Sequence, residues 1–450
     1  MKKVFLVFLT LVAALSLFAC SGEPQPRSEI NGVGLEEYSI VYSESDTDYA
    51  KRAAEYLQAE ILSRTGLELQ LLTDGAETGA HEIVVGNTSR SISTQLDEKT
   101  DGVKFSILAK DGSVALEGNY FVVAAAAYYF IDTYVPTDDY SATVPEEARV
   151  LDPIVKQANN YIMLIGDGMG VYHTKMFEYY ENTCEFGDGE DVFYGYMLPY
   201  IGYSKTNSLS GVTDSAAGGT ALSTGYKTIN GYVGIDKDGN ELQSLTELFG
   251  SKGKKGAVMS TENQTGATPA TFSAHANDRD SSSDIRDDQF ALADLYGTVI
   301  DCGYNYYNKN GIKTTEKHIV DALAKVNCDE GFFFMYEEAY IDKHSHKNDM
   351  EKTYQAVIRF NQAIARFMEF AFYNPDTMVI ITADHETGDL RPNDSGTLSF
   401  NYDDHTSADV LVFAYGMDAA QFHGKTLENV KIAHAIADLI GEHSFGDRSE

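Results

Sequence analysis

Carboxylate and imidazole side chains occur in this sequence at spacings that suit a metal ion. Asp342 and His346 are four residues apart, which places both on one face of a helical turn. Asp384 and His385 are adjacent and follow an apolar stretch directly, and His405 comes twenty residues later. Carboxylate oxygens and imidazole nitrogens are ordinary zinc ligands. Either pair alone is equally typical of a solvated surface, and only their combination favours a metal site.

A hydroxyl group that could act as a nucleophile lies at Ser215, within the sequence Thr-Asp-Ser-Ala-Ala at residues 213–217. The small residues that follow allow a helix to begin at the serine and to pack closely on a sheet. A hydroxyl at a helix N-terminus lies in positive potential, which stabilises an oxyanion. An isolated Asp-Ser-Ala is more often an ordinary helix cap, so the metal-ligand residues elsewhere are what favour a chemical role.

Three further segments carry side chains of related chemistry. Asp167 stands between two glycines after an apolar stretch, where a turn aspartate is the alternative to a ligand. Glu337 ends another apolar stretch. Pro269 predicts the first turn of a helix, and Arg279 follows it. A guanidinium group binds phosphate in bidentate fashion, although a surface arginine is an equal alternative.

The elements that must position these residues follow an α/β pattern. Helical patterns lie between several of the apolar stretches at 161–165, 257–260, 331–336, 378–382 and 410–415. This alternation predicts a doubly wound, mostly parallel sheet with helices on both faces. Ligands of such sheets bind outside the carboxyl ends of the strands, which is where the candidate residues fall. The predicted catalytic domain covers residues 158–442.

A separate, small α+β domain is predicted for residues 36–150, in the order β-α-β-β-β-α. Its first helix has an apolar face and ends at Gly66. The segment holds no cluster of catalytic residue types and resembles the small N-terminal domains that precede some glycoside hydrolases. That resemblance implies an accessory module. Residues 136–153 are predicted to be a linker.

The first twenty residues predict export. Two lysines precede an apolar run, which is typical of a secretory signal. Residues 17–20, Leu-Phe-Ala-Cys, resemble a bacterial lipobox, in which Cys20 becomes the lipidated first residue; cleavage of a conventional signal near Ala19 is the alternative. Residues 21–35 are predicted to be a tether. We therefore expect an exported protein, lipid-anchored at Cys20 on the periplasmic or outer face of the cell envelope.

Composition limits the classes of partner. The chain has 450 residues, of which 43% are hydrophobic, enough for two domains with cores of their own. Acidic residues number 68 against 34 basic residues, and the formal net charge is −34. Such a surface repels nucleic acid and anionic lipid, so we expect no nucleic acid partner.

Three cysteines remain beyond Cys20, which permits at most one internal disulfide. Cys302 and Cys328 lie in one segment and are the favoured pair over any pair that includes Cys184.

Taken together, these motifs resemble those of the alkaline phosphatase family in order and spacing, from roughly residue 158 to residue 440. The resemblance implies a site with two zinc ions and one magnesium ion. Ser215 would attack phosphorus to give a phosphoseryl intermediate, and Arg279 would bind the phosphate. One zinc ion would be held by Asp342, His346 and His405, the other by Asp167, Asp384 and His385, and the magnesium ion by Asp167, Thr268 and Glu337.

The sequence also departs from the family pattern. Gly266 stands two residues before Thr268, where the family usually has Asp or His, so we expect water to fill that place and magnesium to bind more loosely. If magnesium is instead held tightly, Glu338 is the nearest candidate in sequence for the missing contact. Asp389 stands where glycine is common. Only nineteen residues separate His385 from His405, so the family's large insertion there is missing and the site is expected to be open.

The expected function is hydrolysis of small phosphomonoesters by an alkaline phosphatase. A phosphodiesterase or sulfatase of the same superfamily is the alternative enzyme, although Ser215 and the magnesium pair Thr268 and Glu337 favour monoesters. A non-catalytic envelope lipoprotein that binds phosphorylated or glycan ligands is the alternative from another class. The resemblance also leaves a homodimer open.

Overall fold

The computed structural model describes residues 28–44, 48–96, 100–135, 141–180, 192–304 and 309–449. The chain divides into two compact units, Met1–Ile154 and Val155–Glu450. Cys20, the leader before it and Cys184 lie outside the described residues. Within the described ranges, none of the helices combines the length and the apolar character that crossing a membrane requires.

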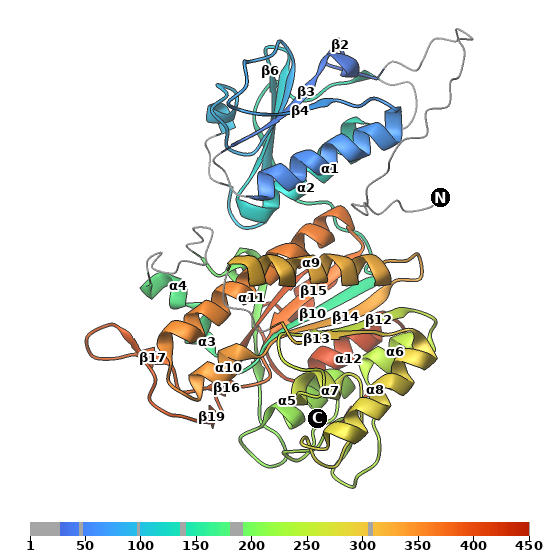
Figure 1. Ribbon diagram of the computed structural model, residues 1–450, viewed down its shortest axis with the longest axis vertical. Coiled ribbons are helices and arrows are strands. Elements are labelled where there is room, and N and C mark those ends of the chain that lie inside the picture. Colours follow the sequence, from blue (N-terminus) through green and yellow to red (C-terminus); the bar gives the residue numbers. More distant parts are fainter. Residues whose placement is uncertain are drawn as a thin grey trace. The chain divides into compact units, whose positions relative to one another are not determined.

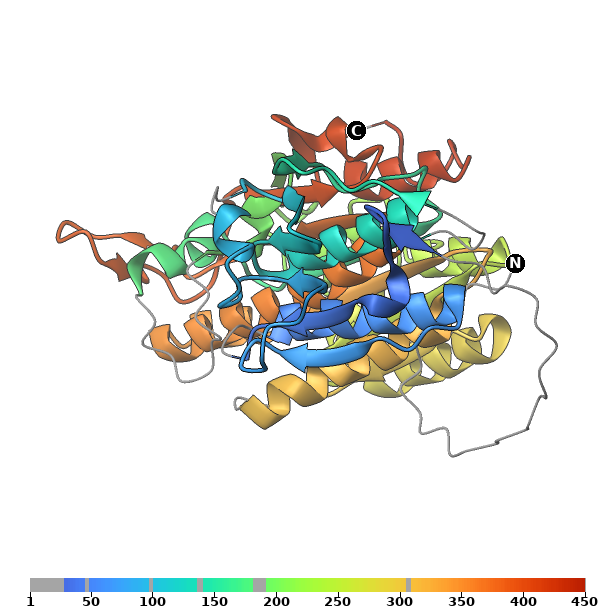
Figure 2. The same cartoon turned by 90° about the horizontal axis from the view of Figure 1, so that it is seen from above.

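The first unit is a six-stranded mixed sheet with two helices on one face (Figure 1). Its strand order is β4 (Gln70–Thr73), β3 (Ser39–Tyr42), β5 (Glu82–Val85), β7 (Ser113–Gly118), β6 (Phe105–Lys110) and β9 (Arg149–Leu151). Helices α1 (Asp48–Thr65) and α2 (Val123–Tyr134) pack side by side on the sheet (Figure 2). The predicted apolar face of α1 is buried, and Gly66 ends the helix with φ 76°.

Two predicted connections in this unit are wrong. Residues 28–35 are not all tether, because β1 (Glu29–Ile30) and β2 (Val33–Gly34) form a hairpin within them. The predicted linker also contributes strands: β8 (Ser141–Ala142) pairs with β1, and β9 pairs with β6. These strands have two or three residues, too few for hydrophobic alternation to reveal them.

The second unit contains the predicted α/β sheet, which is doubly wound and mostly parallel. Strands β13, β12, β14, β10 and β15 are parallel in that order, and β20 pairs antiparallel with β15 and with β11. Strand β21 completes the sheet beside β11. The bounds are β10 (Asn160–Gly166), β11 (Tyr200–Lys205), β12 (Lys255–Ser260), β13 (Val299–Cys302), β14 (Phe332–Glu338), β15 (Thr377–Thr382), β20 (Val410–Tyr415) and β21 (Thr426–Glu428).

Helices cover both faces of this sheet, because its central strands are apolar on both sides (Figure 1). Phe333 packs against Phe249 of α6 (Leu245–Ser251), on the face that α12 (Val430–Leu439) also covers. The next residue, Phe334, packs on the opposite face against Phe367 of α11 (Met350–Tyr373), where α9 (Lys309–Val326) lies beside α11.

The favoured disulfide does not form, since Cys302 and Cys328 are both free thiols. Cys302 ends β13 and lies opposite Ser260 at the carboxyl edge of the sheet. Cys328 precedes β14 and bonds to the carbonyl of Gly331 at the opposite, amino edge. A disulfide needs Cα atoms within about 7 Å, so thiols at opposite strand ends cannot pair.

Candidate active site

The candidate residues gather at the carboxyl edge of the parallel strands. Strands β10, β14 and β15 are in register, with Ile165 opposite both Glu337 and Thr382. Asp167 therefore follows β10 at the level where β14 ends with Glu337 and Glu338 and where the chain leaves β15 for Asp384. Strands that end together place their following loops at one site.

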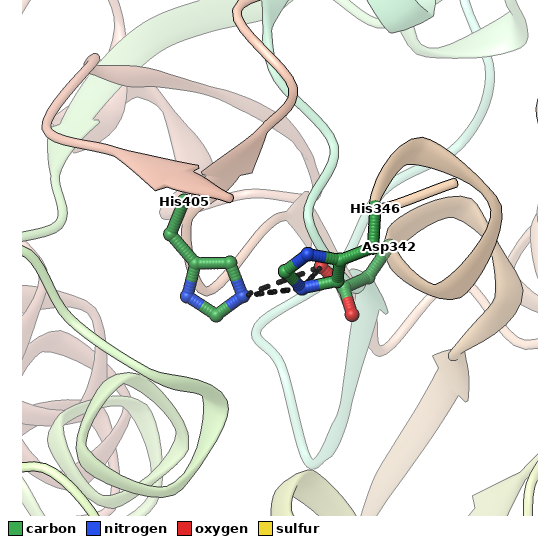
Figure 3. Close-up of side chains that lie close together, drawn as sticks. All are labelled: Asp342, His346 and His405. Carbon is green, nitrogen blue, oxygen red and sulfur yellow. Dashed lines mark hydrogen bonds and ion pairs between the residues drawn. The ribbon is translucent and has the colours of Figure 1, made fainter. Parts of the chain in front are cut away.

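Asp342, His346 and His405 form the first candidate metal group, here called the rim triplet (Figure 3). Asp342 belongs to α10 (Tyr340–Ser345), and His346 directly follows that helix. His405 comes from β19 (His405–Thr406), which pairs with β16 (Glu386–Thr387). The Nε2 atoms of His346 and His405 lie 3.3 and 3.4 Å from Oδ1 of Asp342 and 3.1 Å from each other.

Backbone carbonyls orient both imidazole rings of the rim triplet. Nδ1 of His346 lies 2.8 Å from the carbonyl oxygen of Asp403, and Nδ1 of His405 lies 2.8 Å from that of Thr213. A carbonyl oxygen only accepts, so each Nδ1 must carry the proton and donate it. In the neutral rings the Nε2 lone pairs then converge on Asp342, which is the arrangement that a metal ion requires.

Asp167, Asp384 and His385 form the second group, the buried triplet. Nε2 of His385 lies 3.5 Å from Oδ1 of Asp167 and 3.3 Å from Oδ2 of Asp384. Those two carboxylate oxygens are buried and have no hydrogen-bond partner among the described residues. Buried polar atoms are nearly always paired, so these oxygens fit a cation.

Ser215 lies against the buried triplet, with its Oγ 3.3 Å from Nε2 of His385. It is the first residue of α5 (Ser215–Thr224), whose N-cap Asp214 accepts a hydrogen bond from the backbone N–H of Ala217 at 3.0 Å. Gly218 lets α5 pack closely against Asp384, because a Cβ at position 218 would lie 3.0 Å from the carbonyl oxygen of Asp384. The predicted helix start at Ser215 is therefore where the structure has it.

Arg279 is held near Ser215 by Asp214, a residue to which the sequence alone assigned no role. Its Nη1 donates to Oδ2 of Asp214 at 3.0 Å, and the backbone N–H of Gly231 donates to the same oxygen at 3.0 Å. The side chain of Arg279 remains 36% exposed. Asp214 thus caps α5 and anchors the arginine, a double role that only the fold reveals.

The predicted magnesium ligands also meet at this edge. Oε1 of Glu337 and Oγ1 of Thr268, like Oδ1 of Asp167, are buried and lack a hydrogen-bond partner among the described residues. The other oxygen of Glu337 accepts from the hydroxyl of Ser260, which lies opposite it in the sheet. Burial, followed by the charge of Glu262, raises the pKa of Glu337 well above its usual value. These unpaired oxygens are the hard ligands that Mg²⁺ prefers.

Glu338, the fallback that the sequence offered for the missing contact, does not serve this third set. Its carboxylate pairs with Arg359 and accepts from Thr261, all of them buried. Successive side chains of a strand point to opposite faces, so Glu338 must point away from Glu337. Asp389, which replaces a glycine common in the family, has φ 46° and lies in the turn after β16. Glycine adopts this left-handed conformation more readily than aspartate.

Burial and neighbouring charges set the protonation of both triplets. Burial, then the charges of Asp384 and Asp342, raise the pKa of Asp167 well above its usual value. Burial and Asp342 raise the pKa of Asp384 to about 6. Burial alone would lower the pKa of His405, but its hydrogen bond to Asp342 and the charge of that carboxylate raise it to about 9. A bound dication would reverse the raised carboxylate pKa values.

The segment between His385 and His405 is short, as the sequence shows. After β16 it forms only the hairpin of β17 (Arg391–Pro392) and β18 (Leu398–Ser399) before β19. His346 remains 34% exposed, so solvent reaches the rim triplet.

Comparison with known proteins agrees with this geometry. The family described as alkaline phosphatase matches residues 158–302 and 309–394, together more than half of the chain. The chain belongs to the alkaline phosphatase family. Proteins of this family are metal-dependent, and the two triplets are candidate metal-binding groups in this member of it.

Relatives of this alkaline phosphatase family member are distant. Alkaline phosphatase 3 of Bacillus subtilis is 29% identical over 287 residues, 52% of this chain and 62% of that protein. Alkaline phosphatase of Escherichia coli is 39% identical over 127 residues, 28% of this chain and 27% of that protein. The chain thus spans about three fifths of the length of the Bacillus relatives it matches.

Solved structures share the fold. A variant of the alkaline phosphatase from the Antarctic bacterium TAB5, described with Mg bound in its M3 site, is 25% identical with a TM-score of 0.55. The match covers 65% of this chain and all of that chain. Alkaline phosphatase of Thermus thermophilus, 18% identical with a TM-score of 0.53, agrees in fold.

Proposed function

We propose that this protein is an alkaline phosphatase that hydrolyses small phosphomonoesters (EC 3.1.3.1) through a phosphoserine intermediate. The observation that carries the proposal is the position of Ser215: its Oγ lies 3.3 Å from the His385 nitrogen that faces both aspartates of the buried triplet. Arg279, anchored on the neighbouring Asp214, supplies a partner for phosphate oxygens.

The residues fit two zinc ions, one in each triplet, and a magnesium ion at Asp167, Thr268 and Glu337. When bound, such ions supply Lewis-acid charge that activates a hydroxyl group and neutralises the reacting phosphate. The magnesium assignment is also supported by the Mg that the TAB5 variant is described as holding in its M3 site.

The chain's own residues account for binding and attack. Arg279 donates two N–H groups to nonbridging phosphate oxygens and so presents phosphorus to Ser215. Oγ of Ser215 bonds to phosphorus as the bond to the ester oxygen breaks, which releases the alcohol and leaves a phosphoseryl group. Water then attacks phosphorus, the bond to Ser215 breaks, and inorganic phosphate leaves. The N-terminus of α5 stabilises the serine oxyanion at the start and end of this cycle.

The test compares one phenol in three esters. The zinc- and magnesium-loaded protein is assayed on the aryl phosphate, the bis-aryl phosphate diester and the aryl sulfate. We expect the monoester to be hydrolysed at least about 100-fold faster, a preference of about 2.7 kcal/mol in transition-state free energy. A faster diester or sulfate reaction would assign the protein to the other branches of the superfamily, and no hydrolysis at all would favour a binding protein.

We also propose that Cys20 carries a lipid anchor and that residues 36–150 form an accessory module without catalytic residues. Support for the anchor is the sequence Leu-Phe-Ala-Cys at residues 17–20 after an apolar run. Replacing Cys20 with serine should move the exported protein from the membrane fraction to the soluble fraction. Continued membrane association of that variant would contradict the anchor.

A further inference from the structure

Position 266 lacks the side chain that the third metal site needs, yet the space beside it is filled. A Cβ at Gly266 would collide with the carboxylate of Glu262, whose Oε1, Cδ and Cγ are its nearest neighbours. Gly266 has φ −58° and ψ 152°, which any residue can adopt, so backbone strain does not require glycine here. The glycine instead leaves room for the side chain of Glu262.

Glu262 reaches this place from the loop after β12, at the same carboxyl edge as Glu337. Its backbone N–H donates to Oγ of Ser260 at 3.0 Å, and the hydroxyl of Ser260 donates in turn to Glu337. The side chain of Glu262 is only 11% exposed, and its Oε2 lies 2.7 Å from Nζ of Lys343. Lys343 directly follows the rim ligand Asp342 in α10.

The formal charges around Glu262 and Glu337 favour the binding of a dication. Three carboxylates, those of Glu262, Asp167 and Glu337, act electrostatically on one ammonium group, that of Lys343, and Glu262 contacts it directly. Their formal charges sum to −2, and a buried excess of that size is unfavourable without a cation. Independently, Glu337 and Thr268 are each fully buried, and each has a side-chain oxygen without a hydrogen-bond partner in the part of the chain that the structure describes.

We propose that Glu262 is the positioning residue of the third metal site, where it replaces the side chain missing at Gly266. Its carboxylate holds the water shell of a magnesium ion bound by Asp167, Thr268 and Glu337, and it keeps Lys343 at the edge of that site. This inference rests on the proposed function, because it takes the third site to be a magnesium site. Mg²⁺ retains several waters, so an acid beyond its direct ligands can still control its affinity.

The test measures Mg²⁺ binding to the zinc-loaded, full-length protein by calorimetry. Glu262→Gln keeps the shape and removes the charge, and it should weaken Mg²⁺ binding by about 10–100-fold, as outer-shell changes typically do. Zinc content should not change, because Glu262 belongs to neither triplet. The matched control is Glu241→Gln, the same change at an exposed glutamate, which should leave Mg²⁺ affinity as in the wild type.

Moving the carboxylate from position 262 to position 266 tests whether weaker Mg²⁺ binding comes from the lost charge or from a folding defect. The double variant Glu262→Ala with Gly266→Asp should recover most of the Mg²⁺ affinity. Gly266→Asp alone should not improve binding, because two carboxylates would then compete for one place. If Glu262→Gln does not fold, Glu262→Asp, which retracts the charge by one methylene group, should still weaken binding measurably.

The outcomes distinguish this inference from the proposed function. Unchanged Mg²⁺ affinity in the folded Glu262 variants, in a wild type that hydrolyses the aryl phosphate, would overturn the role of Glu262 alone. Affinity that depends on Glu262 in a protein without phosphatase activity would overturn the function and keep the metal site. A wild type that binds no Mg²⁺ overturns the inference, whatever its activity.

Discussion

The two triplets contain the same kinds of ligand in different surroundings. In the buried triplet the side chains are between 0% and 3% exposed, whereas in the rim triplet His346 is 34% exposed and His405 is 11% exposed. Ser215 contacts His385 of the buried triplet, and its loop contacts the rim triplet through the carbonyl of Thr213. The buried triplet therefore contacts Ser215, whereas the rim triplet is open to solvent.

Burial also makes the two groups respond differently to losing a ligand. In the buried triplet an unpaired carboxylate cannot be solvated, so metal loss should cost stability as well as activity. In the rim triplet, water can replace a missing ligand. The following predictions test this difference, from the largest expected effect to the smallest.

Ser215→Ala should lower turnover of an aryl phosphate by about 10³-fold or more, because it removes the group that forms the covalent intermediate. Zinc content should stay as in the wild type, since Ser215 belongs to neither triplet. Acid quenching with labelled phosphate should trap a phosphoprotein in the wild type and none in the variant. Labelled phosphoserine in the alanine variant would refute the assignment.

His385→Ala and His405→Ala should differ in a direct comparison. Each removes a proposed direct ligand, so each should weaken the binding of one zinc ion by more than the roughly 10–100-fold that is typical of outer-shell changes. Excess zinc should restore occupancy in His405→Ala, and His385→Ala should stay inactive and melt at a lower temperature. Metal analysis and melting curves measure both effects. Equal loss and equal rescue in the two variants would remove the distinction between rim and buried sites.

In the metal-free protein, His405 should make stability depend on pH. Although burial opposes it, Asp342 raises the pKa of His405 to about 9, above the unfolded value near 6.5. The stabilisation is therefore complete below about pH 6.5 and is lost as pH rises through about 9. The loss should be on the order of 3 kcal/mol in the free energy of unfolding, at about 1.4 kcal/mol for each pH unit between the two pKa values. Denaturant unfolding in the presence of a chelator measures it.

The control for this pH dependence is His405→Gln, which should reduce the loss of unfolding free energy between pH 7 and pH 9. His385→Gln should retain it, because burial lowers the pKa of His385 to values below this range. The same slope in wild type and His405→Gln would show that other groups cause it.

Removal of the first unit should have the smallest effect. A truncated protein that begins at Val155 keeps both triplets, Ser215 and Arg279. We expect its kcat/KM for a small aryl phosphate to change by less than about twofold, since a change of that size is under 0.5 kcal/mol. A soluble, folded truncated protein without activity would show that residues before 155 contribute to the site.

Local spacing in the sequence was sufficient to predict the strands that carry the site, the helix start at Ser215 and the ligand pairs Asp342 with His346 and Asp384 with His385. The full membership of both groups was implied by the resemblance to the family, and the structure brings those members together. Strand ends, adjacent ligands and residues four apart on a helix are short-range features, and parallel strands bring such ends to one edge. The same reasoning identified the apolar face of α1, whose period is a property of one helix.

Only the tertiary structure decided which face of the sheet a side chain points to and which residues meet at one end of the strands. Glu338 is adjacent to Glu337 in sequence but points to the other face of the sheet. Glu262 is far from Glu337 in sequence, yet it lies at the same carboxyl edge, where it fills the space beside Gly266. Cys302 and Cys328 lie in one segment but at opposite strand ends. The distance between two residues in the sequence does not tell whether they lie on the same face of a sheet or at the same end of its strands. Burial, which distinguishes the buried triplet from the rim triplet, arises only when the elements pack.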